Sequence, residues 1–196
     1  MAVALARQVE TPQQRWVSDV PLIIEPIRLP GVRALDLIVG VPLLTAALPA
    51  IAALILVTKL TSPGLAFVRT AKLGQGGRPF DMLQFRTTDE NGTTRWGRLL
   101  RSSGLADLPI LINVVVGTMS LVGPRPVTAA AAGHPSMMGA PPLALKPGWT
   151  GPWRIQPAAT ARERAQHDRT YTETRTFAGD IRLLARTVKS LVWWPR

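Results

Sequence analysis

LIVGVPLLTAALPAIAALILVT, residues 37–58, is the stretch that decides the fold. It holds no charged residue, and Arg33 and Asp36 precede it while Lys59 follows it. A helix of this length reaches across the apolar part of a bilayer. A buried helix of a soluble protein is the alternative, but such helices seldom run so far without a charge. We therefore expect a membrane helix over residues 33–59.

Two prolines, Pro42 and Pro49, interrupt this apolar run. Proline removes a backbone donor and clashes with the preceding turn, so we expect a kink, chiefly at the central Pro49. Basic residues lie on both sides of the run, and cytoplasmic flanks collect Lys and Arg. This pattern favours a re-entrant helix, with both ends on the cytoplasmic side, over a membrane-spanning one. The spanning topology stays open.

Composition narrows the classes of partner. The 196 residues carry a formal charge of +11, which predicts a polyanionic partner: nucleic acid, an anionic membrane surface or a phosphorylated substrate. The chain has no Cys, which excludes disulfides, thiolate metal sites and a Cys nucleophile. His134 and His167 stand apart without metal-like spacing. Met1–Arg15 lacks the apolar run of a signal peptide, so we expect none.

The rest of the chain predicts a small α-rich α/β domain. A polar lead (1–32), with a short strand or an extended segment at 20–27, precedes the membrane helix (33–59), and the domain covers 60–196. We expect strands at 65–69 and 78–85 around a glycine loop (74–77), helices at 94–100 and 105–116, a tight loop at 121–126 and a flexible loop at 129–142. Helices at 160–176 and 180–194 follow. The last is amphipathic and ends in Trp193-Trp194, so it lies on the bilayer surface or is an ordinary surface helix.

Five arginines and one carboxylate are the candidate site residues. The phosphate-binding candidates are Arg86, Arg95, Arg98, Arg101 and Arg125. Arg125 stands out because Gly123-Pro-Arg-Pro126 holds its backbone between two prolines, which suits contact with a phosphate in a set geometry. Asp107 is the only acid between Glu90 and Glu163. On its own it is more often a helix cap than a metal or catalytic ligand.

The order of motifs resembles that of the bacterial sugar transferases, the monotopic phosphoglycosyl transferases that start exopolysaccharide, O-antigen and protein-glycan assembly. The resemblance runs from about Arg33 to Lys189, and its most specific piece is MSLVGPRP at 119–126. The other matching pieces are RALDL (33–37), SPG (62–64), LGQGGRPF (73–80), FRT (85–87), TRWG (94–97), LR (100–101), LP (108–109), LINV (111–114), KPGWTG (146–151) and DRTY (168–171).

This resemblance implies a re-entrant helix in the inner membrane and an α/β catalytic domain with surface helices on its cytoplasmic face. It implies an Asp–Glu pair that works with Mg²⁺: the Asp attacks the β-phosphate of a UDP-sugar and releases UMP, and polyprenyl (undecaprenyl) phosphate then takes the sugar phosphate. The chemistry suits these groups, because a carboxylate nucleophile splits one displacement into two and cations neutralise the diphosphate. The implied partners are the UDP-sugar, the polyprenyl phosphate and the bilayer, and not nucleic acid.

The chain departs from the family pattern at its polar positions. The family's Leu-Asp-Glu-Leu-Pro is Leu105-Ala-Asp-Leu-Pro109 here. Ala106 occupies the nucleophile position, and a methyl group cannot attack phosphorus. Asp107 occupies the position of the Glu, so the catalytic and metal-binding roles fall to it. The family's Lys, Gln and Asp at three other positions are Gln84, Ile110 and Thr118 here.

Two functions of different class follow. In the first, the chain is an active transferase in which Asp107 acts as the nucleophile, or in which a metal and Arg promote direct attack by the lipid phosphate. Alternatively it is a catalytically impaired relative that binds a nucleotide sugar or polyprenyl phosphate, or that partners a second copy or an active paralogue. A basic protein that binds membranes or nucleic acid is the weakest reading, because it leaves the motif order unexplained and the chain lacks interleaved aromatic and basic residues.

Overall fold

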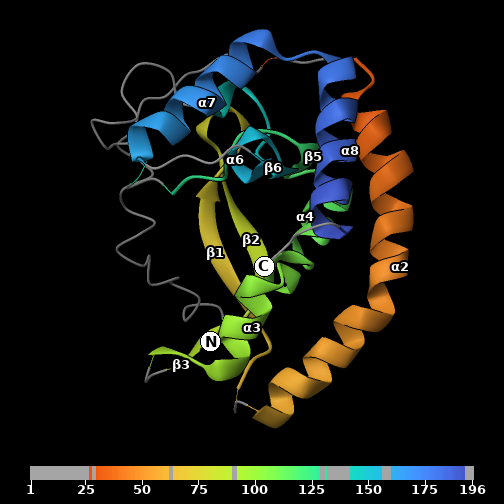
Figure 1. Ribbon diagram of the computed structural model, residues 1–196, viewed down its shortest axis with the longest axis vertical. Helices are drawn as coiled ribbons and strands as arrows, with labels where there is room; N and C mark the ends of the chain where they lie inside the picture. The colour runs from red at the N-terminus through yellow and green to blue at the C-terminus, as the bar shows by residue number, and fades with distance from the viewer. Residues whose placement is uncertain are drawn as a thin grey trace, which may run out of the picture.

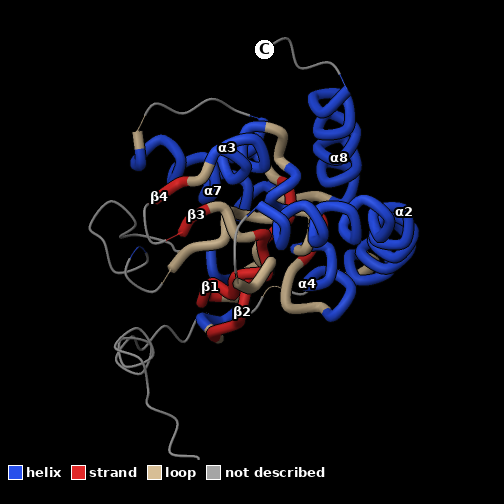
Figure 2. Tube along the Cα trace, turned by 90° about the horizontal axis from the view of Figure 1, so that it is seen from below, coloured by secondary structure: helices blue, strands red, loops and turns tan. Residues whose placement is uncertain are grey.

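The computed structural model describes residues 27, 30–61, 64–89, 92–128, 131, 142–155 and 160–192 (Figure 1). Several predictions fall outside these residues: the strand at 20–27 apart from Ile27, nearly all of the loop at 129–142 with His134, and the Trp193-Trp194 end. Within the described part, helices surround a central hairpin and one long helix lies along the side of the molecule (Figures 1 and 2).

The long helix is α2, Val32–Thr61, which contains Pro42 and Pro49 and bends part-way along its length (Figure 1). It is long and apolar enough to cross a membrane, and little of it is buried. Its exposed apolar side chains are Leu37, Ile38, Val39, Val41, Leu43, Leu48, Leu56 and Leu60. A core helix of a soluble protein would bury such a face, so this exposure favours contact with the membrane.

The start of α2 is fastened to the globular body by two charged side chains. Arg33 donates hydrogen bonds of 2.7 Å to the carbonyls of Val114 and Val115. These carbonyls lie near the C-terminal end of a short helix, where a cation stabilises the helix terminus. The buried carboxylate of Asp36 accepts bonds of 2.8 Å from Ser120 Oγ and from the backbone N–H of Leu121. The charges that frame the apolar run in the sequence therefore anchor it.

The end of α2 packs on the same body. Trp96 Nε1 donates a 3.0 Å hydrogen bond to Thr58 Oγ1. About two turns further back, Ile51 is buried in an apolar cluster with Phe85 and Leu100. Both ends of the apolar helix are thus held by one globular unit, and Leu44 and Ala47 in its middle also pack against that unit.

Strands β1, Phe67–Leu73, and β2, Pro79–Phe85, form the central antiparallel hairpin, which turns through the 3₁₀ segment η1, Gln75–Gly77. The prediction for β2 is confirmed. The prediction of a strand at 65–69 is wrong in extent, because β1 pairs along its full length with β2. The polar residues Thr70 and Lys72 hide this strand from an apolar pattern, but backbone pairing with β2 decides it.

After the hairpin the chain forms a short β-pair and two helical pieces. Strands β3, Thr88–Asp89, and β4, Gly92–Thr93, pair with each other. Helix α3, Arg95–Ser102, confirms the predicted helix and is capped by Thr94, whose Oγ1 accepts from the Gly97 N–H at 2.8 Å.

The single helix predicted over 105–116 is wrong. The structure has a 3₁₀ turn η2, Leu105–Asp107, and then helix α4, Ile110–Val116. Pro109 separates them, because it has no backbone N–H to continue a helix from the preceding turn. Gly104, with φ of 73°, makes the bend from α3 into η2.

The C-terminal part wraps around a parallel strand pair. Strand β5, Ser120–Val122, lies beside β6, Gly148–Thr150, so the predicted loop at 121–126 is in part a strand. The short segments are η4, Pro142–Ala144, and α6, Pro152–Ile155. Helix α7, Ala161–Thr174, confirms the predicted polar helix, and Thr160 and Glu163 form its capping box. Helix α8, Phe177–Val192, begins three residues earlier than predicted.

The early start of α8 reflects a buried charge. Asp180 is 1% exposed, accepts 2.6 Å from the Tyr171 hydroxyl and pairs with Arg175 at 2.7 Å. The polar residue that marks the predicted helix start is therefore inside the protein. On the exposed side, Phe177 and Ile181 are apolar, which keeps the bilayer-surface reading of this helix open.

Candidate functional site

A cavity of about 290 Å³ lies where β2, α3 and η2 meet. Gln84 reaches it from β2, Arg101 from α3, and Ala106 and Asp107 from η2. Because Gly104 turns the chain sharply between α3 and η2, the two positions that correspond to the family's carboxylate pair face the hairpin. The structure thus brings together Ala106, Asp107 and one of the five predicted arginines.

Asp107 is held by side chains rather than acting as a helix cap. Its Oδ1 accepts a 2.7 Å hydrogen bond from Gln84 Nε2, and its Oδ2 lies 3.7 Å from Arg154 Nη1. The N-cap residue of α4 is Pro109. The helix-cap interpretation of Asp107 is therefore wrong, and its carboxylate belongs to the cavity.

Arg154 is a site residue that the sequence reasoning missed. Its guanidinium lies over the rings of Trp149 and Trp153, at 5.6 and 5.9 Å from their centroids, and Nη1 donates to the Trp149 carbonyl at 3.3 Å. Its Nη2 is close to Gly104, where a Cβ would stand 3.1 Å away. The available signal was an arginine directly after Trp153 in a segment that matches the family.

The predicted arginines do not form one cluster. Arg101 lines the cavity and its Nε donates to Thr87 Oγ1 at 2.8 Å. Arg86 points back toward Gly64 at the turn after α2. Arg95 and Arg98 are exposed on α3 and do not line the cavity.

Arg125 lies at the other end of the hairpin, where Leu73 bridges to Val127. Its backbone N–H donates to Asp168 Oδ1 at 3.3 Å, while its side chain is exposed. Burial raises the pKa of Asp168 to about 6. Burial, and then the charge of Arg125, lowers the pKa of Lys72. A second cationic corner therefore exists, formed by Arg125 and Lys72.

The hairpin runs between two groups of cations, Arg101 at the Asp107 cavity and the pair formed by Arg125 and Lys72. Val68 pairs with Gln84, Thr70 with Met82, and Lys72 with Phe80, and residues two apart on a strand share a face. Lys72 therefore lies on the same face as Gln84, two strand pairs further along.

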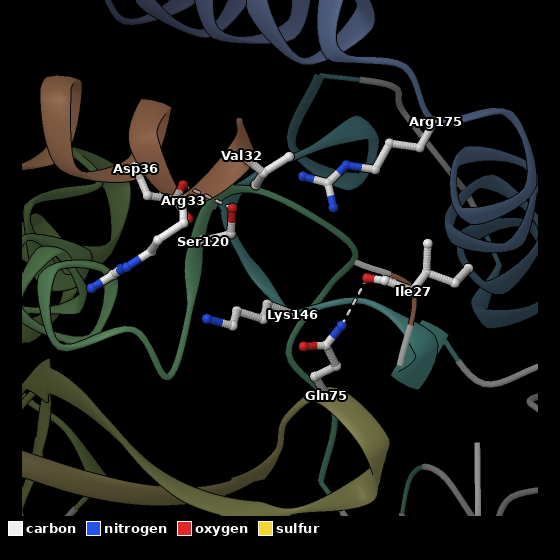
Figure 3. Close-up of a pocket in the computed structure, with 8 residues that line it drawn as sticks. All are labelled: Ile27, Val32, Arg33, Asp36, Gln75, Ser120, Lys146 and Arg175. Carbon is white, nitrogen blue, oxygen red and sulfur yellow. Dashed lines mark hydrogen bonds between the residues drawn. The ribbon is translucent and has the colours of Figure 1, made fainter. Parts of the chain in front are cut away.

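A larger cavity, about 360 Å³, lies at the start of α2 (Figure 3). Its charged groups are mostly committed to structural bonds: Asp36 to β5, Arg33 to α4 and Arg175 to Asp180. Lys146 reaches into it, and burial followed by the charge of Arg33 lowers its pKa (Figure 3). The charged residues that line this cavity hold α2 and α8 in place, so the smaller cavity at Asp107 is the better candidate for chemistry.

The residues around Asp107 do not fit a metal held by the protein. Within the described part of the chain, no group of three His, Cys, Asp or Glu side chains comes together. Asp107 offers one carboxylate, of which one oxygen accepts from Gln84 and the other faces a guanidinium. Mg²⁺ sites usually supply one or two carboxylates that are free to bind the ion. The Mg²⁺ implied by the resemblance therefore stays a prediction.

Comparisons with known proteins identify the family to which the chain belongs. The model of the family described as bacterial sugar transferase matches residues 28–194. The UDP-glucose:undecaprenyl-phosphate glucose-1-phosphate transferase of Caulobacter vibrioides is 34% identical over 185 residues, covering 82% of this chain and 69% of the relative. The protein of the same name from Xanthomonas campestris pv. campestris is 33% identical over 177 residues, covering 78% of this chain and 37% of the relative.

A shorter relative matches along most of its length. The exopolysaccharide production protein ExoY of Sinorhizobium fredii is 27% identical over 199 residues, covering 86% of this chain and 88% of the relative. The chain thus spans about two thirds of the Caulobacter protein and little more than a third of the Xanthomonas protein.

Proposed function

Because the chain belongs to the bacterial sugar transferase family, we propose that it transfers a sugar 1-phosphate from a UDP-sugar to undecaprenyl phosphate at the membrane. The names of the Caulobacter and Xanthomonas relatives support the two substrates. The single observation that carries the proposal is the cavity at Asp107, which joins the family's carboxylate segment to Arg101 and Gln84.

The alanine at position 106 bears on whether the reaction proceeds by one displacement or by two. Ala106 is buried and lines the cavity, so the position that would carry the covalent intermediate has only a methyl group. We propose a single displacement. An oxygen of the lipid phosphate bonds to the β-phosphorus of the UDP-sugar, the bond from that phosphorus to the bridging oxygen breaks, and UMP leaves with that oxygen. Arg101, at the cavity wall, stabilises the charge that gathers on the phosphates.

The membrane helix would place the lipid substrate beside this cavity. Both ends of α2 pack on the same globular body, through Asp36 at the start and Thr58 at the end. This arrangement supports the re-entrant topology at the cytoplasmic face of the inner membrane. The end of α2 also packs in the same apolar cluster as Ala106, through Ile51. A lipid lying along α2 would therefore have its phosphate near the site.

Release of UMP from UDP-sugars by the purified full chain tests the proposal. Single displacement predicts slow release that requires undecaprenyl phosphate, because the protein has no group at position 106 to accept the sugar phosphate. If Asp107 instead acts as the nucleophile, UMP appears in a burst without lipid, and Asp107→Asn abolishes the burst. Arg162→Gln, an exposed change on α7, is the matched control.

The impaired relative is the second candidate function, and Ala106 is the observation that favours it. In that case the chain binds UDP-sugar or undecaprenyl phosphate without turnover, or partners a second copy or an active paralogue. Binding of UDP without UMP release from any UDP-sugar, with lipid present, would select this candidate.

A further inference from the structure

We propose that Arg154 is the cation that binds the donor's diphosphate in this chain, and that donor binding is independent of a divalent ion. This inference rests on the proposed function, since it assigns the charge partner of the UDP-sugar at the same cavity. It departs from the Mg²⁺-dependent pattern that the resemblance implies.

The local charge at the cavity favours an anion. Two guanidinium groups, those of Arg101 and Arg154, stand at or beside the cavity, and Asp107 is the carboxylate among them. The local formal charge is therefore positive before any ligand enters. A diphosphate is attracted to such a site without a metal, whereas a divalent cation placed beside Asp107 would meet the charge of Arg154.

Arg154 has hydrogen-bond donors available for a ligand. Its distance of 3.7 Å to Asp107 is a charge contact and is too long for a hydrogen bond. Its one hydrogen bond within the described part of the chain goes from Nη1 to the carbonyl of Trp149. A guanidinium has five N–H donors, so most of them remain available for phosphate oxygens.

The Arg154 side chain is already held in place before a ligand binds. The guanidinium lies over the rings of both Trp149 and Trp153, and the Arg154 side chain is only 19% exposed. A side chain fixed in this way loses little entropy when it binds a ligand. The side-chain N–H groups of both indoles are buried and find no acceptor among the described residues. This corner of the molecule is therefore short of acceptors, as expected where an anion binds.

The experiment measures UDP affinity by calorimetry for the full chain in detergent, with excess EDTA and again with Mg²⁺. We expect wild-type affinity to change less than about twofold between the two conditions. A lost charge-assisted contact is worth about 1.5–3 kcal/mol, so Arg154→Gln should weaken UDP binding about tenfold or more in EDTA. Arg154→Lys, which keeps the charge, should retain part of the affinity, and Arg162→Gln should bind as the wild type does.

Asp107→Asn separates this inference from a metal site. If Arg154 binds the phosphates, removing the carboxylate that competes for it leaves UDP affinity in EDTA unchanged or raises it. If Asp107 holds a metal that binds the diphosphate, the wild type needs Mg²⁺ and Asp107→Asn binds more weakly. The second result overturns the inference and leaves the proposed function standing. Absence of UDP binding under both conditions contradicts the proposed function and the inference together.

Discussion

At the scale of single residues, the charges of this protein divide into those that hold the fold and those that remain for a ligand. Asp36, Arg175 and Asp180 are buried or nearly so, and each has a defined partner. Arg154 and Asp107, in contrast, make a loose pair beside a cavity. Sequence alone does not separate these two kinds, because both are single charged residues in mixed segments.

Asp168 gives a residue-scale prediction of pH dependence. Its carboxyl is 2% exposed, and burial raises its pKa from 3.8 to about 6 in the folded chain. The folded state then binds more protons than the unfolded state between these values, so stability falls as pH rises through this window. The full effect is about 3 kcal/mol at most.

Asp168→Asn removes this titration and keeps the acceptor for the Arg125 N–H. Above pH 7 we expect the variant to be more stable than the wild type by about 2 kcal/mol, with the difference vanishing near pH 4. Urea unfolding in detergent micelles over this pH range measures it. The exposed Asp81→Asn is the control, and parallel pH curves for the wild type and Asp168→Asn would contradict the prediction.

At the scale of elements, backbone contacts place the site. Helix α3 lies directly on the chain after β2, because Gly97 has no side chain and the Thr87 carbonyl occupies the place where its Cβ would stand. This contact sets the distance between the hairpin, which carries Gln84, and the helix, which carries Arg101. A similar close contact between backbones joins the ends of β5 and β6, where Gly123 lies against Gly148.

Gly97→Ala tests this placement. The added methyl group overlaps the Thr87 backbone, so α3 must move and the protein should lose about 2 kcal/mol of stability or more. Thermal unfolding in detergent measures the loss, and Ser102→Ala on the same helix should change it by less than about 0.5 kcal/mol. A Gly97→Ala protein as stable as the wild type would show that α3 does not lie where described.

The elements also show how far the sequence leads. The apolar run, β2, α3 and α7 follow from hydrophobic pattern and capping residues, and the Ala106–Asp107 segment follows from motif order. The bend at Gly104 and the pairing of β1 over Lys72 do not. The bend depends on how η2 packs on β2, and the polar residues of β1 are placed by backbone pairing with β2 rather than by an apolar pattern. Arg154 escaped notice because it lies 47 residues after Asp107 in the sequence and meets it only in the folded chain.

At the scale of the whole molecule, the position of α2 relates the site to the bilayer. The helix exposes many apolar side chains while both of its ends pack on the globular body. On α8, Phe177 and Ile181 add exposed apolar side chains, and Phe177 lies close to Gly31 beside the start of α2. Exposed apolar side chains on both helices are therefore available for contact with a membrane.

Because the chain has no Cys, single cysteines report the topology directly. Pro30→Cys precedes α2 and Thr93→Cys follows it, and both positions are exposed. A re-entrant helix predicts that a membrane-impermeant maleimide labels both from the same side of oriented vesicles. Labelling from opposite sides would show that α2 spans the membrane.

The central claim is that the chain is a family transferase whose nucleophile position is occupied by alanine. The most direct test of this claim measures the transfer of labelled glucose from UDP-glucose to undecaprenyl phosphate by the Ala106→Asp variant. The cavity at position 106 has room for a carboxylate beside Asp107. We expect label in the lipid extract at least about tenfold above the wild type, with a covalent sugar-phosphate adduct in the intact mass of the variant. Absence of both label and adduct, in a folded variant that binds UDP, would contradict it.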